Sequence, residues 1–117
     1  MAYELMVEDA FSAAHQLKGY EGKCENLHGH TFRVQVFIAG SDLGKTGMLM
    51  DFKQIKLELK AVLEEFDHLN LNDLPLFSGQ NPTAENLARE IYLKLNVLNP
   101  SKVTVWESAS AWASYRK

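Results

Sequence analysis

The spacing of apolar residues changes twice along this 117-residue chain, and that order limits the folds it can adopt. Over residues 3–11 and 30–39, apolar and polar side chains largely alternate, which is typical of strands with one buried face. Over residues 51–66 and 81–98, apolar residues recur every third or fourth position, which is typical of amphipathic helices. Two further strands are predicted at 102–108 and 111–115, joined by a turn at 108–110.

Local signals support these boundaries. Asp51 is a good N-cap for the first helix, Pro82 suits the first turn of the second, and Asn99-Pro100 ends it. The predicted order is strand, strand, helix, helix, strand, strand. It indicates an α+β fold, ββααββ, with a four-stranded antiparallel sheet and both helices on one face. Open edge strands in so small a protein favour pairing with another copy, so we expect a homo-oligomer.

Composition narrows the class of protein. The length suits a single domain, residues 1–117, and we expect neither a targeting segment nor a membrane span. The net charge is −3 and the basic residues are scattered, which argues against nucleic acid as a partner. The one cysteine, Cys24, allows no internal disulfide, so a reducing cytoplasm is the expected location.

Three of the four histidines have the spacing of a metal site. His28 and His30 open a predicted strand, and residues two apart in a strand point the same way. His15 follows the first strand, and a hairpin-like return of the chain would bring it opposite this pair. Three neutral imidazoles make a catalytic type of zinc site with an open fourth position. The alternative is that they are separate structural or surface histidines.

Cys24 precedes His28 by four residues and lies among polar neighbours, which suggests a partly exposed loop. Nearby zinc would lower the pKa of this thiol, and the thiolate could then act as a base or as a metal ligand. The alternatives are a small buried apolar residue, or a structural zinc site in which Cys24 is the fourth ligand.

Other polar residues are weaker candidates. Asp67-His68 could be an oriented acid-base pair, or an ordinary histidine at the end of a helix. Glu107, within an apolar strand, needs a partner; a guanidine-like ring edge with two N–H donors would satisfy it, as would an ordinary salt bridge. Thr83 and Glu85 near the start of the second helix could simply cap it.

Together these motifs carry a family resemblance over the whole chain. The chain resembles the family of 6-pyruvoyl-tetrahydropterin and 6-carboxy-tetrahydropterin synthases. The resemblance implies the tunnelling fold (T-fold), in which three subunits join their sheets into a barrel and two rings stack into a hexamer. The matching segments are Phe11-Ser12-Ala13-Ala14-His15, Cys24 with His28-Gly29-His30, Met50-Asp51-Phe52, Asp67-His68-Leu69-Asn70, Asn81-Pro82-Thr83-Ala84-Glu85-Asn86 and Val105-Trp106-Glu107.

The resemblance also implies residue roles. Zinc would be held by His15, His28 and His30. Proton transfer would involve Cys24, Asp67 and His68. Glu107 would anchor the guanidine-like edge of the pterin, while Thr83 and Glu85 would contribute to the site of a neighbouring subunit.

The implied substrate is 7,8-dihydroneopterin triphosphate. The three-residue spacer between Cys24 and His28 resembles most the bacterial 6-carboxy-tetrahydropterin synthases of queuosine and other 7-deazapurine synthesis, which release acetaldehyde and triphosphate. The 6-pyruvoyl product is an alternative. So is cleavage to 6-hydroxymethyl-dihydropterin for folate synthesis, because a related subgroup uses a glutamate in place of the cysteine and this chain also has Glu25.

Two other classes of protein remain open at this point. A three-histidine zinc site alone also supports a hydratase or hydrolase that uses zinc-bound hydroxide, although this leaves Glu107 and Asp67-His68 without a role. The non-catalytic alternative is a zinc-stabilised assembly protein that binds no pterin.

Overall fold

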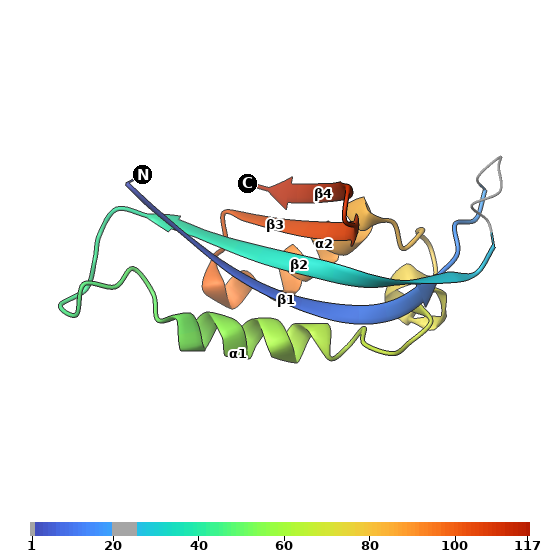
Figure 1. Ribbon diagram of the computed structural model, residues 1–117, viewed down its shortest axis with the longest axis horizontal. Coiled ribbons are helices and arrows are strands. Elements are labelled where there is room, and N and C mark those ends of the chain that lie inside the picture. The colour runs from blue at the N-terminus through green and yellow to red at the C-terminus, as the bar shows by residue number, and fades with distance from the viewer. Residues whose placement is uncertain (1, 20–25) are drawn as a thin grey trace.

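The computed structural model describes residues 2–19 and 26–117 (Figure 1). Four strands and two α-helices follow the predicted order, with three short 3-10 helices between them. The elements are β1 (Tyr3–His15), β2 (His28–Gly40), α1 (Phe52–Leu63), η2 (Leu71–Asp73), η3 (Pro75–Phe77), α2 (Ala84–Lys94), η4 (Asn96–Leu98), β3 (Lys102–Ser108) and β4 (Ala111–Arg116).

The sheet is antiparallel throughout and its strands lie in the order β1-β2-β3-β4. β1 and β2 pair along their full length, from Tyr3 opposite Gly40 to His15 opposite His28. β3 pairs only with the middle of β2, from Arg33 opposite Trp106 to Phe37 opposite Lys102. The β1–β2 hairpin therefore extends beyond β3 at both ends, and the molecule is long and narrow, 53 × 25 × 23 Å (Figure 1).

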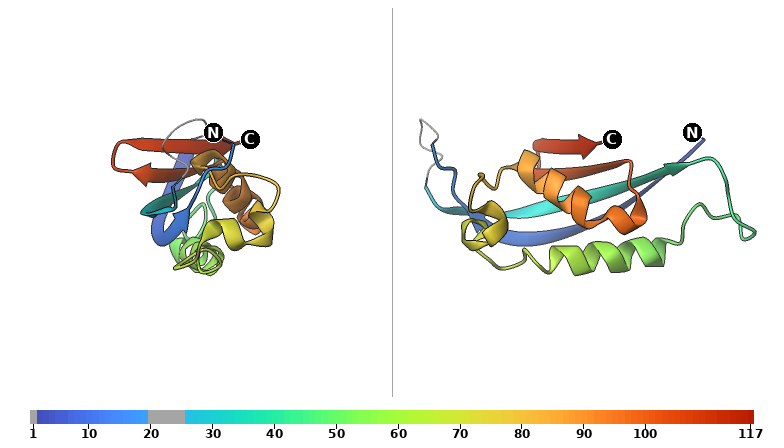
Figure 2. Two further views of the ribbon diagram at one scale, coloured as in Figure 1. Left: turned by 90° about the vertical axis from the view of Figure 1, so that its right-hand side faces the viewer. Right: turned by 180° about the vertical axis from the view of Figure 1, so that it is seen from behind.

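Both helices cover the same side of the twisted sheet (Figure 2). α1 packs on β1, and α2 packs on β3 and β4. In β2, in β3 and in most of β1, alternate residues face the helices and are largely buried, as the alternation predicts. Asp9 of β1 is an exposed exception, and β4 has no buried residue. The helices contribute the apolar stripes that the sequence indicates. The buried apolar residues from the strands are Val7, Phe11, Ala13, Phe32, Val34, Val36, Ile38, Val103 and Val105, and those from α1 and α2 are Ile55, Leu59, Val62, Leu63, Ala84, Leu87, Ala88 and Ile91.

The other face of the sheet carries a polar network, as expected for a face without helices. Glu8 accepts hydrogen bonds from Arg33, through Nε and Nη2, and from Gln35, through Nε2. Gln35 in turn accepts from Trp106 Nε1, and the Arg33 guanidinium lies 4.9 Å from the centre of the Trp106 ring. The Arg33 and Gln35 hydrogen bonds hold the pKa of Glu8 below its usual value.

α1 begins as predicted, because the Asp51 side chain accepts a hydrogen bond from the Lys53 N–H. It ends at Leu63, however, and not at Phe66. The chain turns sharply here, with the N–H groups of Phe66 and Asp67 both bonded to the Leu63 carbonyl. This turn keeps Phe66 in the core, and it brings the following residues back to the edge of β1.

The boundaries of the second helix also differ from the prediction. α2 begins at Ala84, so Asn81 and Pro82 precede it, and Thr83 is the N-cap that accepts a hydrogen bond from the Asn86 N–H. α2 ends at Lys94, where the η4 turn replaces the predicted last turn. The buried side chains of Leu95 and Leu98 nevertheless continue the apolar stripe.

The two edges of the sheet differ. The segment that follows α1 pairs with the outer edge of β1 near the end of this strand: His68 N–H donates to the Ser12 carbonyl (2.6 Å) and Ala14 N–H to the Leu69 carbonyl (2.9 Å). Within 2–19 and 26–117, no strand covers residues 3–11 of β1 or the outer edge of β4. Among the described helices, none has the length and apolar character that crossing a membrane requires.

Candidate metal centre

The β1–β2 hairpin places three imidazoles together at one end of the sheet. His15 lies directly opposite His28, and His30 lies opposite Ala13. All three side chains have the strand parity of Phe11 and Phe32, so they extend the row of core residues towards the end of the sheet. Ala13 is small enough to leave space for the ring of His30. Both strands are longer than predicted, and His15 and His28 are residues within them, not residues beside them.

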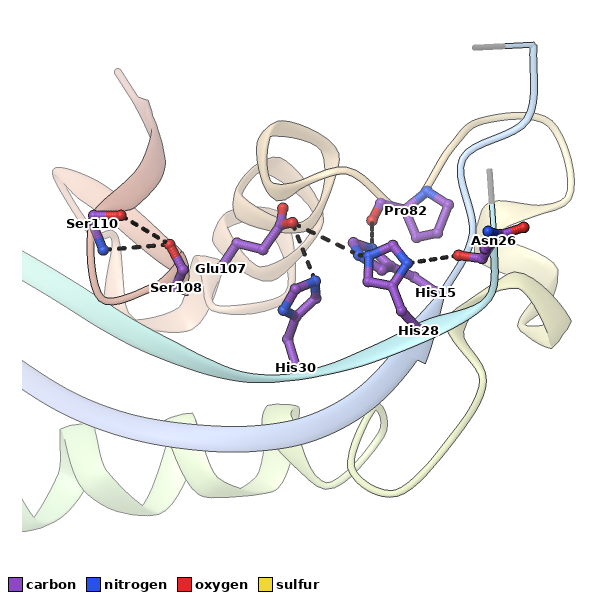
Figure 3. Close-up of polar contacts among 8 residues, drawn as sticks. All are labelled: His15, Asn26, His28, His30, Pro82, Glu107, Ser108 and Ser110. Carbon is purple, nitrogen blue, oxygen red and sulfur yellow. Dashed lines mark hydrogen bonds and ion pairs between the residues drawn. The ribbon is translucent and has the colours of Figure 1, made fainter. Parts of the chain in front are cut away.

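The ligand-type atoms of this cluster converge (Figure 3). His15 Nε2 lies 3.1 Å from His28 Nε2, and His30 Nε2 lies 3.2 Å from Glu107 Oε1. Glu107 Oε1 is also 4.0 Å from His15 Nε2. One ligand atom from each of the four residues lies within 4.8 Å of all the others. We call His15, His28, His30 and Glu107 the histidine cluster.

Backbone carbonyls orient two of the rings. His15 Nδ1 lies 2.8 Å from the Pro82 carbonyl oxygen, and His28 Nδ1 lies 2.6 Å from the Asn26 carbonyl oxygen. A carbonyl oxygen only accepts hydrogen bonds, so the proton of each neutral ring is assigned to Nδ1. The lone pair of each Nε2 is then directed into the cluster, which is how outer contacts commonly prepare histidines for a metal.

His30 is the third inward-facing ring. Burial lowers its pKa, and the proximity of His15 and His28 acts in the same direction, while the charge of Glu107 opposes them. Its Nε2 atom is buried and makes no hydrogen bond with the described residues, although Glu107 is within ion-pair distance. A buried nitrogen of this kind calls for an explanation, and a metal ion bound at this nitrogen would provide one.

The donor set fits zinc. Imidazole nitrogens and carboxylate oxygens are common zinc ligands, and tetrahedral zinc with bonds near 2.0–2.1 Å holds its ligand atoms roughly 3.3 Å apart. The 3.1 and 3.2 Å separations within the cluster are close to this value. The three predicted histidines are therefore brought together in a geometry suited to one metal ion.

Glu107 comes from β3, on the same face as Val103 and Val105, next to an irregularity in the β3–β4 register between Trp106 and Ser108. The sequence indicates that this carboxylate needs a partner. In the structure its contacts are His30 and His15, so its charge faces the same space as the three Nε2 atoms (Figure 3).

Asp67 and His68 form a separate pair. Asp67 Oδ1 accepts a hydrogen bond from the Ser12 N–H (2.9 Å), and Oδ2 lies 2.9 Å from His68 Nδ1. These contacts, the Ser12 one first, hold the pKa of Asp67 below its usual value. His68 has a φ of 59°, a left-handed conformation that is uncommon for a non-glycine residue, and its side chain is 82% exposed.

This pair does not belong to the histidine cluster. It lies along the outer edge of β1, beside an open groove of about 610 Å³. His68, Ser12 and Asn70 help to line this groove, and so does His30 of the histidine cluster. The sequence could not show whether Asp67 and His68 lie in the histidine cluster or at the outer edge of β1, because it does not reveal which side of β1 receives the segment after α1.

The remaining predicted site residues that the structure describes, Thr83 and Glu85, lie at the start of α2. Thr83 caps α2, and Glu85 is exposed in its first turn. Cys24 and Glu25 lie outside the described residues. Sequence reasoning missed the backbone carbonyls of Asn26 and Pro82 as partners of the histidines, since carbonyls leave no signal in side-chain patterns.

Fold and site together define a T-fold protein with a metal-competent histidine cluster. The family model for 6-pyruvoyl tetrahydropterin synthase matches residues 4–117. The chain therefore belongs to this family, whose members are enzymes acting on pterins.

The chain is similar to known proteins over most of its own length and of theirs. The chain is 40% identical over 116 residues to a 6-carboxy-5,6,7,8-tetrahydropterin synthase of Synechocystis, covering 92% of this chain and 88% of the relative. It is 36% identical over 112 residues to a dihydroneopterin monophosphate aldolase of Pyrococcus furiosus, covering 92% and 91%. The solved 6-pyruvoyl tetrahydropterin synthase of Caenorhabditis elegans superimposes with a TM-score of 0.89 at 30% identity, covering 98% and 95%.

Proposed function

We propose that this protein is a zinc-dependent lyase that converts 7,8-dihydroneopterin triphosphate to 6-carboxy-5,6,7,8-tetrahydropterin, releasing acetaldehyde and triphosphate. The observation that carries the metal part of the proposal is the convergence of His15, His28 and His30, with Nδ1 of the first two bonded to carbonyls. The similarity to a 6-carboxy-tetrahydropterin synthase over most of both chains supports the product. We expect the reaction to serve queuosine or 7-deazapurine synthesis in the cytoplasm.

The histidine cluster would hold the ion through three Nε2 atoms. When bound, zinc supplies Lewis acidity that polarises the side-chain hydroxyls of the substrate. The lowered pKa of His30 keeps this ring neutral, and therefore able to bind a metal, around neutral pH. The carbonyl contacts of His15 and His28 keep these rings in the required tautomer.

Glu107 would anchor the pterin. Its carboxylate is positioned beside the three Nε2 atoms, and its two oxygens can accept from two parallel N–H donors of the guanidine-like edge. An anchor at this point would direct the side chain of the pterin towards the metal. The alternative use of Glu107 is as a fourth metal ligand, which its 3.2 Å distance from His30 also permits.

Proton transfer is assigned to Cys24, Asp67 and His68. Asp67 orients His68 and leaves its ring accessible, which suits a general acid or base. Because this pair lies on the outer edge of β1 and is not among the groups that converge in the histidine cluster of its own chain, we propose that it acts in the site of a neighbouring copy. We extend this proposal to Thr83 and Glu85 at the start of α2.

A homo-oligomer is required for that arrangement. The outer edges of β4 and of residues 3–11 of β1 are the strand edges that would join copies into a barrel. We propose a hexamer made of two trimers. Each chain would act as one pterin-synthase domain spanning residues 1–117.

A second candidate reaction is cleavage to 6-hydroxymethyl-dihydropterin. The similarity to a protein named dihydroneopterin monophosphate aldolase favours it, and Glu25 would then supply the acid-base group. A 6-pyruvoyl product remains the third candidate, by similarity to the Caenorhabditis elegans protein. The candidate of another class is a zinc-stabilised assembly protein without catalysis.

The test is product identification by mass spectrometry after zinc-loaded protein is mixed with 7,8-dihydroneopterin triphosphate. Wild-type protein is compared with Cys24→Ala, Glu25→Gln and His30→Ala. We expect a 6-carboxy product and acetaldehyde, both lost with Cys24→Ala and His30→Ala and retained with Glu25→Gln.

Other products would redirect the assignment. A hydroxymethyl product that survives Cys24→Ala and is lost with Glu25→Gln would support the aldolase reaction. Absence of turnover and of any pterin difference spectrum, together with loss of the oligomer on zinc removal, would support the assembly protein.

A further inference from the structure

The segment that follows His15 is held by two asparagine side chains. Gln16 N–H donates to Asn72 Oδ1 (2.8 Å), and Asn72 Nδ2 donates back to the Gln16 carbonyl (2.9 Å). Lys18 N–H donates to Asn81 Oδ1 (2.8 Å), and Asn81 Nδ2 donates back to the Lys18 carbonyl (2.8 Å). Residues 16–18 lie beyond the end of β1, yet Gln16 and Lys18 have both backbone groups bonded, as in a sheet.

These four bonds continue a pattern that begins within β1. In an extended chain, alternate residues present their N–H and C=O groups to the same side. Ser12 and Ala14 use this outer side to bond with segment 67–69. Gln16 and Lys18 use it to bond with Asn72 and Asn81. The amide groups therefore replace a neighbouring strand where none is present among the described residues, and they hold the chain immediately after His15 in place.

One of these asparagines also connects to the ring of His15. Pro82, whose buried carbonyl accepts from His15 Nδ1, is the residue directly after Asn81. The Asn81 carbonyl accepts a hydrogen bond from Asn86 Nδ2 (2.8 Å), which ties this backbone to α2. Asn81 thus joins the backbone of Lys18 to the peptide that orients the imidazole.

We propose that Asn72 and Asn81 are positioning residues for the metal centre: together they fix the backbone after His15 and the carbonyl that orients its ring. The inference rests on the proposed metal site and assigns it two residues that touch neither metal nor substrate. An amide is required at both positions, because each side chain donates one hydrogen bond and accepts another. Aspartate has the same shape but, when ionised, has no hydrogen to donate.

The test measures metal binding by the purified protein, without turnover. Zinc affinity is determined by competition with a chromophoric chelator for wild type, Asn72→Asp and Asn81→Asp, and the cobalt(II) absorption spectrum of each is recorded. Outer-shell changes commonly weaken metal binding 10- to 100-fold, and we expect about 10-fold for each aspartate variant and a changed cobalt spectrum for Asn81→Asp. Asn96→Ala is the matched control, since Asn96 is exposed on η4 and its side chain bonds to none of the described residues.

The outcomes are distinct. Wild type that binds zinc, together with both aspartate variants binding as tightly as Asn96→Ala and with unchanged cobalt spectra, overturns this inference and leaves the proposed function intact. Wild type that binds no zinc overturns both. Circular dichroism of the apo proteins establishes that each variant is folded; if an aspartate variant is not, Asn72→Ala and Asn81→Ala replace it under the same criteria.

Discussion

Phe32 packs against the histidine cluster, and replacing it should affect folding and metal binding together. Its ring is fully buried and stacks on Phe11, with ring centres 5.0 Å apart. It also meets the rings of His15 and His30, edge to face, at 5.4 and 5.5 Å. The substitution Phe32→Leu keeps an apolar side chain but removes all three ring contacts.

The cost can be worked out from these contacts. The change in shape and volume in a packed core costs about 1 kcal/mol, and the lost stacking on Phe11 costs about 1 kcal/mol more. We expect the free energy of unfolding of the apo protein in urea to fall by about 2 kcal/mol. Because two ligand rings lose their support, zinc affinity should fall on the order of 10-fold.

Phe66→Leu is the matched control. Phe66 is equally buried and packs on Phe11 with ring centres 5.6 Å apart, but among the described residues it makes no ring contact with a histidine. It should lose similar unfolding free energy and keep its zinc affinity. Equal zinc affinities for the two variants would refute the claim that Phe32 orients the ligands.

Three further predictions concern the cap, the acid limit and the metal. Thr83→Ala should lower the free energy of unfolding by about 1 kcal/mol in urea, since its side chain accepts from the Asn86 N–H, and Thr83→Ser should restore it. The Ser12 N–H and the neighbouring imidazole hold the pKa of Asp67 in the folded state below 3.8, so the folded state binds fewer protons than the unfolded one. The ionised Asp67 side chain therefore stabilises the folded state above pH 3.8, and this stabilisation is lost as pH falls through the folded-state pKa. Asp67→Asn should therefore unfold with a shallower dependence on acid than wild type, and an unchanged profile would contradict this. Zinc at 100 times its Kd should stabilise the protein by about 2.7 kcal/mol in thermal unfolding, an effect that a chelator removes and that His30→Ala should lack.

Much of the fold follows from apolar periodicity. Alternation identifies the buried faces of both long strands, and helical spacing identifies the faces of α1 and α2 that cover them. Periodicity is less informative at element ends. Phe66 continues the apolar stripe of α1 but belongs to a turn, because its ring reaches the core equally well from there.

The convergence of the three histidines was partly predictable for the same reason. His28 and His30 have strand spacing, and His15 is near in sequence, so the antiparallel hairpin alone brings them together. Glu107 was predicted to need a partner, but its contacts with His30 and His15 depend on the β2–β3 register.

Hydrogen bonds between a side chain and a backbone group far away along the chain could not be predicted from the sequence. The bonds of Asn72 to Gln16 and of Asn81 to Lys18 join residues 56 and 63 positions apart. An asparagine in a loop is usually explained by its own turn, as with Asn70, whose side chain accepts from the Asn72 N–H. Only the folded structure reveals that Asn72 and Asn81 bond to the backbone of Gln16 and Lys18, in the segment that follows β1.

The hairpin origin of the three imidazoles also bears on how the protein folds. His15, His28 and His30 lie within one short stretch of sequence, whereas Glu107 joins them only after β3 pairs with β2. That pairing closes loops of 65 residues, between Phe37 and Lys102, to 73 residues, between Arg33 and Trp106, which is entropically costly and slow compared with hairpin formation. During synthesis, the complete set of imidazoles leaves the ribosome before either helix. A metal ion held by the histidine cluster would therefore find its three imidazole ligands already in the hairpin, and Glu107 would join them last.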